Sequence, residues 1–194
     1  MIPNTKSILF FIFIFCTLIA FGQDDSNMKK NHWRTEYGLA FTGSGDIYGY
    51  VVNFEYSRQV SDRLFLAPSF GLLNFRSVSN SLSKYANAKS IEIASYFRPI
   101  DKGVFNLELG LGVFIRNWNW DYTTGPNTSF ATDDFQLDNS STGTQKYNTI
   151  GYTISLGAIF NLGETLSIST RLVLQNDTEG DIVTTARPGL IIKF

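Results

Sequence analysis

The sequence predicts an all-β protein: an eight-stranded antiparallel up-and-down transmembrane β-barrel that follows a cleaved signal peptide. Three observations lead to this prediction. The N-terminus is an apolar run, the rest of the chain alternates apolar with polar residues, and the chain ends on an aromatic residue, Phe194. Because successive side chains of a strand point to opposite faces, alternation with a period of two is typical of strands whose two faces meet different surroundings.

The apolar run at the N-terminus covers residues 7–21 and follows Lys6. It is shorter than the roughly 20 residues that a membrane-spanning helix needs. Ala20 and Gly22 place small residues just before Gln23, as a cleavage site for secretion requires. We therefore expect residues 1–22 to be a signal peptide, residues 23–32 a periplasmic N-terminal segment and residues 33–194 an outer-membrane barrel domain. The alternative is an uncleaved anchor helix.

The composition fits an exported membrane protein. Charged residues make up 17% of the chain, against roughly 25% in soluble domains. Aromatic residues make up 15%, yet the mean hydropathy is only −0.03, so the apolar residues must be interleaved with polar ones. No basic patch suggests a nucleic-acid partner. The single cysteine, Cys16, lies in the predicted signal peptide, so no thiolate metal site is expected in the mature chain.

Eight runs of alternating residues follow the predicted cleavage site. Short turns at 61–63, 99–103 and 163–165 alternate with longer connections at 43–47, 76–89, 117–149 and 176–181. An even strand number with short turns on one rim is typical of a bacterial barrel whose termini are periplasmic. Pro68 and Pro188 fall inside runs and leave the local strand pairing open. The eight runs are residues 33–42, 48–59, 64–75, 90–98, 105–116, 150–161, 166–175 and 182–194.

Alternation alone does not say which face is inside. A soluble barrel would have an apolar interior and a polar exterior, and a membrane barrel has the reverse. Here the polar face is rich in glycine and alanine, for example at Gly110 and Gly112, whereas the other face carries bulky aromatic and aliphatic residues. An eight-stranded barrel is only wide enough for side chains to fill it, so small residues suit its interior. The membrane arrangement is therefore predicted.

Charged residues also gather on the small-residue face. Charges enclosed in a narrow lumen must pair and hydrogen-bond, and arginine suits this because its guanidinium is planar and always charged. We predict a salt-bridge lattice that plugs the lumen; the functional alternative is a proton or ion path. The predicted lattice consists of Arg34, Glu36, Glu55, Glu92, Arg98, Glu108, Arg116, Arg171 and Arg187.

The C-terminal residues resemble the assembly signal of outer-membrane barrels. Arg187, Gly189, Ile192 and Phe194 match its polar, glycine, apolar and terminal aromatic positions. With the eight runs, the mature chain resembles the small outer-membrane β-barrel family of OmpX-like and OmpA-transmembrane-like proteins, most closely the Bacteroidetes type, whose exported chains often begin with glutamine as at Gln23. The resemblance implies that the barrel assembly machinery reads the last strand and that outer-membrane lipid surrounds the barrel.

The sequence offers little for catalysis. Lipid A-modifying barrels and outer-membrane proteases need a histidine, and the only one here, His32, precedes the first predicted strand at the periplasmic end. We expect an exposed, non-catalytic His32, and no enzyme activity, metal or cofactor. No acidic spacing matches a calcium loop.

The long connection at 117–149 is the one candidate binding segment. It begins with three aromatic residues at alternate positions, Trp118, Trp120 and Tyr122. They form either a recognition surface or the upper aromatic girdle of a longer fifth strand.

Two function classes therefore stay open. The first is a structural or interaction barrel, serving envelope integrity, adhesion or binding of an unknown extracellular or envelope protein. The second is a narrow transport or ligand-handling barrel. A lipid A-modifying enzyme is a remote third.

Overall fold

The computed structural model describes residues 31–43, 47–79, 82–124 and 142–194. The predicted signal peptide and most of the predicted periplasmic segment lie outside these residues. None of the described residues forms a helix long and apolar enough to cross a membrane. The predicted eight-stranded antiparallel barrel is confirmed.

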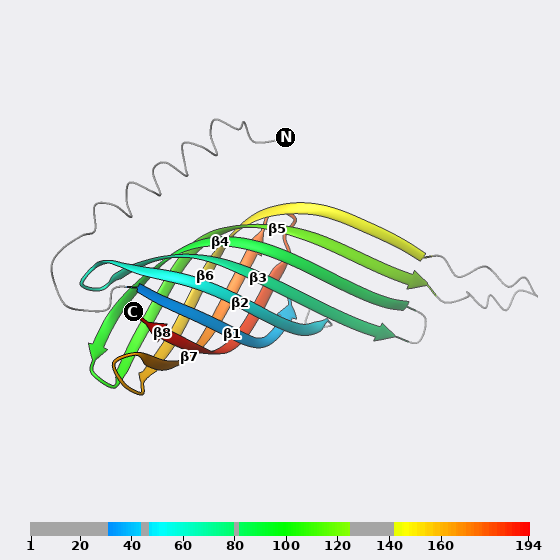
Figure 1. The fold of residues 1–194 in the computed structure, drawn as a ribbon. Helices are drawn as coiled ribbons and strands as arrows, with labels where there is room; N and C mark the ends of the chain where they lie inside the picture. The colour runs from blue at the N-terminus through cyan, green and yellow to red at the C-terminus, as the bar shows by residue number, and fades with distance from the viewer. Residues whose placement is uncertain (1–30, 44–46, 80–81, 125–141) are drawn as a thin grey trace, which may run out of the picture.

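Consecutive strands pair in order, and β8 pairs with β1, so the barrel is closed (Figure 1). At the closure, backbone hydrogen bonds of 2.9 and 3.2 Å join Phe194 and Asn31. The barrel thus begins at Asn31, two residues earlier than predicted. The strands are β1 (Asn31–Thr42), β2 (Tyr48–Ser61), β3 (Leu64–Ser79), β4 (Leu82–Lys102), β5 (Phe105–Thr124), β6 (Thr142–Asn161), β7 (Leu166–Asp177) and β8 (Ile182–Lys193).

Both in-strand prolines are accommodated without a change of register. Pro68 keeps its place opposite Ile93 of β4, and the assigned β2–β3 pairs are interrupted beside it. Pro188 lies opposite Thr170 of β7, and the β1–β8 pairs are interrupted in the same way. Since proline has no N–H to donate, each proline weakens only one of its two neighbouring ladders.

The predicted loop at 76–89 is largely wrong, because β3 and β4 occupy both of its ends. The predicted loop at 117–149 is wrong at 117–124 and 142–149, which are strands, and its residues 125–141 lie outside the described residues. β3 to β6 have 16, 21, 20 and 20 residues, whereas β1, β7 and β8 have 12 each. A tilted strand needs only about 9–11 residues to cross a bilayer. Figure 1 shows the four long strands continuing past the other four at the end opposite the C-terminus. The sequence predicts that this end is extracellular, and we call residues 77–79, 82–88, 117–124 and 142–149 the extracellular sheet.

The two faces of the barrel wall differ as a bilayer demands. Tyr37, Ile91, Leu111 and Ile150 are each 59–66% exposed on the outer face, together with many other aromatic and aliphatic side chains. The inner face buries the charged residues. Transfer of the outer face into lipid is favourable by roughly 25 cal/mol per Å².

Small residues on the inner face make room for large ones. A Cβ on Gly110 would lie 2.5 Å from Cε1 of Tyr96 and 2.2 Å from Oγ of Ser155. A Cβ on Gly151 would lie 2.5 Å from Cζ of Phe114. These glycines are therefore needed because aromatic rings from neighbouring strands occupy the space above them.

Replacing Gly110 with alanine is expected to destabilise the barrel. Tyr96 is held by polar contacts and cannot move aside freely, so the overpacking should lower the free energy of unfolding by about 1–3 kcal/mol. Urea unfolding in lipid vesicles, followed by tryptophan fluorescence, measures this change. Gly163→Ala is the control, because a Cβ there meets nothing within 4 Å. Equal stability of the two variants would contradict the packing argument.

Candidate functional site

The structure buries all nine predicted lumen residues, each between 0 and 6% exposed. Seven of them are joined by ion pairs into one lattice, and Glu92 and Arg116 lie apart from it in a second group. The seven are Arg34, Glu36, Glu55, Arg98, Glu108, Arg171 and Arg187.

The centre of the lattice crosses the lumen. Arg34 on β1 donates two hydrogen bonds, of 2.8 and 2.9 Å, to the carboxylate of Glu108 on β5. In a closed barrel of eight strands, β1 and β5 lie on opposite sides. Arg171 on β7 donates to Glu108 over 3.0 Å and to both oxygens of Glu55 on β2 over 2.8 and 3.2 Å. Two bidentate arginines thus tie four strands together.

Further side chains complete the lattice. Arg98 reaches Glu108 at 3.2 Å. Glu36 accepts a hydrogen bond from Asn53 and lies 3.4 Å from Nε of Arg171 and 3.9 Å from Nη1 of Arg187. Each carboxylate therefore contacts more than one donor, as a buried charge requires.

Tyr96 is a lattice member that the sequence analysis did not include. Its hydroxyl donates to Glu55 over 2.8 Å and accepts from Arg171 over 2.7 Å. It lies on β4 two residues from Arg98 and four from Glu92. Residues an even number of positions apart share a face of a strand, so this spacing could have identified Tyr96 as an inward-facing residue. A neutral phenol here provides both a donor and an acceptor between two charged groups.

The second group lies nearer the extracellular end. Gln175 on β7 donates to Glu92 over 2.9 Å and accepts from Arg116. Asp177, two residues further along β7, lies 3.8 Å from Nη1 of Arg116. Neither Gln175 nor Asp177 was included in the predicted lattice, although each lies an even number of residues from Arg171 and therefore faces inward as Arg171 does.

The two groups together balance their charge. Five arginines face four glutamates and Asp177, all buried. A neutral interior avoids the large free-energy cost of an unpaired charge in a low-dielectric space.

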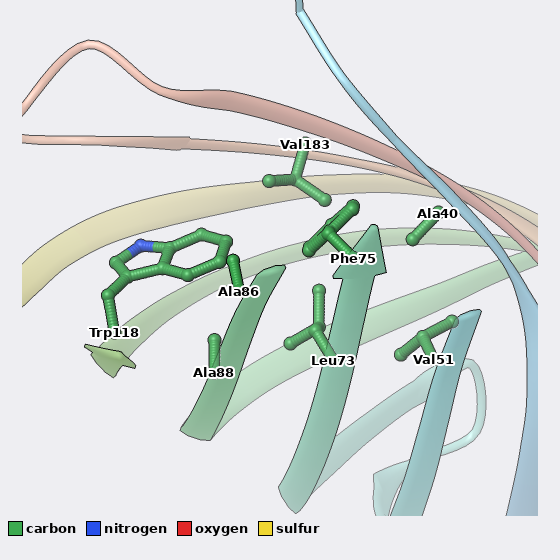
Figure 2. Packing of buried hydrophobic residues seen from close by; sticks show 8 residues of the cluster. All are labelled: Ala40, Val51, Leu73, Phe75, Ala86, Ala88, Trp118 and Val183. Carbon is green, nitrogen blue, oxygen red and sulfur yellow. The ribbon is translucent and has the colours of Figure 1, made fainter. Parts of the chain in front are cut away.

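An apolar layer covers these polar groups on the extracellular side. Phe75 and Trp118 have ring centroids 5.8 Å apart, and alanines from β1 and β4 leave room for them. Figure 2 shows these side chains converging from β1, β2, β3, β4, β5 and β8. The apolar cap consists of Ala40, Val51, Leu73, Phe75, Ala86, Ala88, Trp118 and Val183. The lumen is therefore filled by charges below and by apolar groups above.

Comparison with known proteins identifies the architecture. No protein-family model matches the sequence, and no curated protein matches it either. The fold is similar to Neisserial surface protein A, with a TM-score of 0.60 and 10% identity over 84% of this chain and 97% of that one. By fold, the chain is a small outer-membrane β-barrel.

Two further outer-membrane barrels have a similar fold. Ail, the attachment invasion locus protein of Yersinia pestis, has a TM-score of 0.54 and 14% identity, covering 86% of this chain and 100% of that one. A major outer membrane protein of Thermus thermophilus has a TM-score of 0.52 and 13% identity, covering 84% of this chain and 99% of that one. At these identities the likeness shows the shared fold.

The candidate aromatic surface is not an exposed loop. Trp118 lies in β5, opposite Ala88 and Tyr147, and only 1% of it is exposed. Trp118 and Trp120 share the inward parity of Arg116, so they also do not form an outer girdle. The side chain of Tyr122 lies outside the described residues.

His32 differs from the prediction as well. It lies in β1 rather than before it, is 4% exposed, and stacks on Phe65 with ring centroids 5.3 Å apart. It lies at the end of the barrel where Asn31 and Phe194 meet, and the assignment of this end to the periplasm stays a prediction. Among the described residues, no cluster of three or more histidine, cysteine or acidic side chains could hold a metal ion.

Glu108→Gln tests the energetic weight of the lattice in this outer-membrane barrel. The substitution leaves three arginines facing a neutral amide, so the free energy of unfolding should fall by about 3–5 kcal/mol. Unfolding by urea in vesicles measures the change. Glu164→Gln, in the exposed β6–β7 turn, is the matched control. A Glu108 variant as stable as this control would show that the central carboxylate is dispensable.

Proposed function

We propose that the protein is a closed, non-conducting outer-membrane barrel with a structural or interaction role, which presents its extracellular sheet to a protein partner at the cell surface. The observation that carries the proposal is the extension of β3 to β6 beyond a filled lumen. The alternative function is passage of a ligand through the barrel. It needs an open path along the barrel axis, and the side-chain contacts that fill the lumen would have to break to open one.

The filled lumen supports the interaction role over transport. A route along the axis has to part the Arg34–Glu108 pair, which spans from β1 to β5, and then the apolar cap. Parting a buried ion pair leaves two uncompensated charges, which costs several kcal/mol. An alternative role in proton or ion transfer faces the same barrier.

The extracellular sheet supplies an interaction surface. β6 pairs with β7 only from Gly151 onward, so in the described part of the chain residues 142–149 have no strand on their second side. An open strand edge offers backbone donors and acceptors to an incoming strand. The side chains of Thr144, Gln145 and Lys146 are exposed there, which keeps this edge polar.

The fold neighbours give modest further support. One is described as an attachment protein and another as a surface protein. We propose adhesion or partner binding for this chain by analogy, with envelope integrity as the structural form of the same role. The Bacteroidetes type stays a prediction from the sequence.

The last strand supports a proposal about assembly. Ile192 and Phe194 face outward at 52% and 49% exposure, while Arg187 points inward. We propose that the barrel assembly machinery reads this strand and that outer-membrane lipid then covers its apolar side chains.

The first test is electrical. In planar bilayers the purified barrel is expected to show no large, stable conductance steps, because paired charges and the apolar cap fill its interior. An open porin incorporated under the same conditions is the positive control. Sustained single-channel steps from this barrel would favour the transport alternative.

The second test locates the partner. A photo-crosslinking amino acid at Lys146, on the open edge of β6, is expected to give a discrete protein adduct in intact cells. The same amino acid at Glu164, on the periplasmic turn, is the control for random capture. Replacing residues 119–146 with an Asn-Gly turn removes most of the β5–β6 part of the sheet, which includes the open edge, and should remove binding of the partner identified from the adduct.

The shortened variant must still migrate as a folded barrel in unheated gels. Identical adducts from both positions, or no protein adduct from Lys146, would argue against partner binding through the sheet.

A further inference from the structure

A cavity of about 300 Å³ opens at the extracellular mouth, above the apolar cap. Ile47, Trp118, Trp120 and Val183 line it with apolar groups, and Asp181 contributes a carboxylate. Small-molecule sites begin at about this volume and combine mostly apolar walls with a few polar groups. The cavity is used neither by the salt-bridge lattice nor by the open edge of β6.

Two indoles form one wall of the cavity. The rings of Trp118 and Trp120 lie 5.5 Å apart and are inclined by 32°. Both side chains line the cavity, and Trp118 is only 1% exposed.

Asp181 is fixed in place by the β7–β8 turn. Its N–H donates to Oδ1 of Asp177 over 3.2 Å, and Gly180 turns the chain with a φ of 83° that only glycine adopts easily. The hydroxyl of Tyr147 donates to the Asp181 carboxylate over 3.3 Å. The carboxylate is therefore presented at the cavity by a rigid turn.

The charge at the cavity is negative. The nearby cation, Arg116, already lies 3.8 Å from the Asp177 carboxylate. No basic side chain among the described residues lies within ion-pair distance of Asp181. Burial and the neighbouring Asp177 raise the pKa of Asp181, whereas the Tyr147 hydrogen bond and Arg116 lower it in part.

We propose that this cavity binds a small soluble organic cation, an alkylated or quaternary ammonium compound. The ammonium group pairs with Asp181 and lies against the indoles, where cation–π attraction adds to the ion pair. Trp118, Trp120 and Val183 face the barrel axis rather than the lipid, so the ligand enters from water.

Choline is a suitable probe, because it has a quaternary ammonium group. The full mature barrel with Trp33→Phe is placed in phosphatidylglycerol nanodiscs, so that Trp118 and Trp120 are its only tryptophans. Trp33 lies at the periplasmic end and faces outward, so its replacement leaves the cavity intact. Choline is titrated at constant ionic strength while the tryptophan fluorescence is recorded.

Choline is expected to change the fluorescence saturably. Its uncharged isostere, 3,3-dimethylbutan-1-ol, should bind at least about tenfold more weakly, and Asp181→Asn should weaken choline binding by a similar factor. Tetramethylammonium, which keeps the quaternary ammonium group and lacks the hydroxyl, should bind about as tightly as choline.

Three results would overturn the proposal. They are no saturable change up to roughly 100 mM choline, equal binding of choline and its isostere, or choline binding that Asp181→Asn leaves unchanged. A response seen only in phosphatidylcholine nanodiscs would assign the site to lipid headgroups and would also contradict it. Each variant is first checked for folded-barrel migration. Loss of the Lys146 adduct would leave these titrations unaffected, so this site and the partner-binding proposal can fail separately.

Discussion

The narrowness of an eight-stranded barrel determines most of this structure. Its interior holds side chains and little else, so every group that points inward must be either small or matched by a neighbour. The bidentate pair of Arg34 and Glu108 satisfies this requirement across the full width of the lumen. Because the pair joins opposite strands, it also couples the two halves of the wall. The glycines beside Tyr96 and Phe114 follow from the same shortage of space.

The interior changes character along the barrel axis. Charged groups with several partners each occupy the middle, Arg116 lies above them with Gln175 and Asp177 as its partners, and apolar side chains close the extracellular end. Arg116 marks the boundary, since its guanidinium lies 3.8 Å from Asp177 and also 5.2 Å from the Trp118 ring centroid. An arginine tolerates both surroundings because it forms ion pairs with its edge and stacks with its face. The polar lattice is thus separated from the mouth without an abrupt change in polarity.

Much of this could be predicted from the sequence, and the exceptions have physical causes. Period-two alternation identified eight strands and the inward face, because lipid and lumen impose opposite polarity on neighbouring residues. The ends of β3 to β6 were missed because beyond the lipid the alternation fades into serine, asparagine and threonine. Trp118 was predicted to lie in a recognition loop or an outer aromatic girdle, although its spacing of two residues from Arg116 indicates the inward face. The pairing of Arg34 with Glu108 depends on strand stagger around the whole barrel, which no local pattern contains.

The position of the mouth explains why it offers chemistry that the lumen does not. Inside the barrel each charge is balanced by a fixed partner, so the lattice has no strong preference left for an external ion. The charge of Asp181 is not balanced in this way, because Arg116 already pairs with Asp177 and the side chains above Arg116 are the indoles of Trp118 and Trp120. The same apolar cap that seals the lumen therefore provides the floor of a site with one excess negative charge. Closure of the channel and selectivity for a cation at its entrance are two consequences of one layer of side chains.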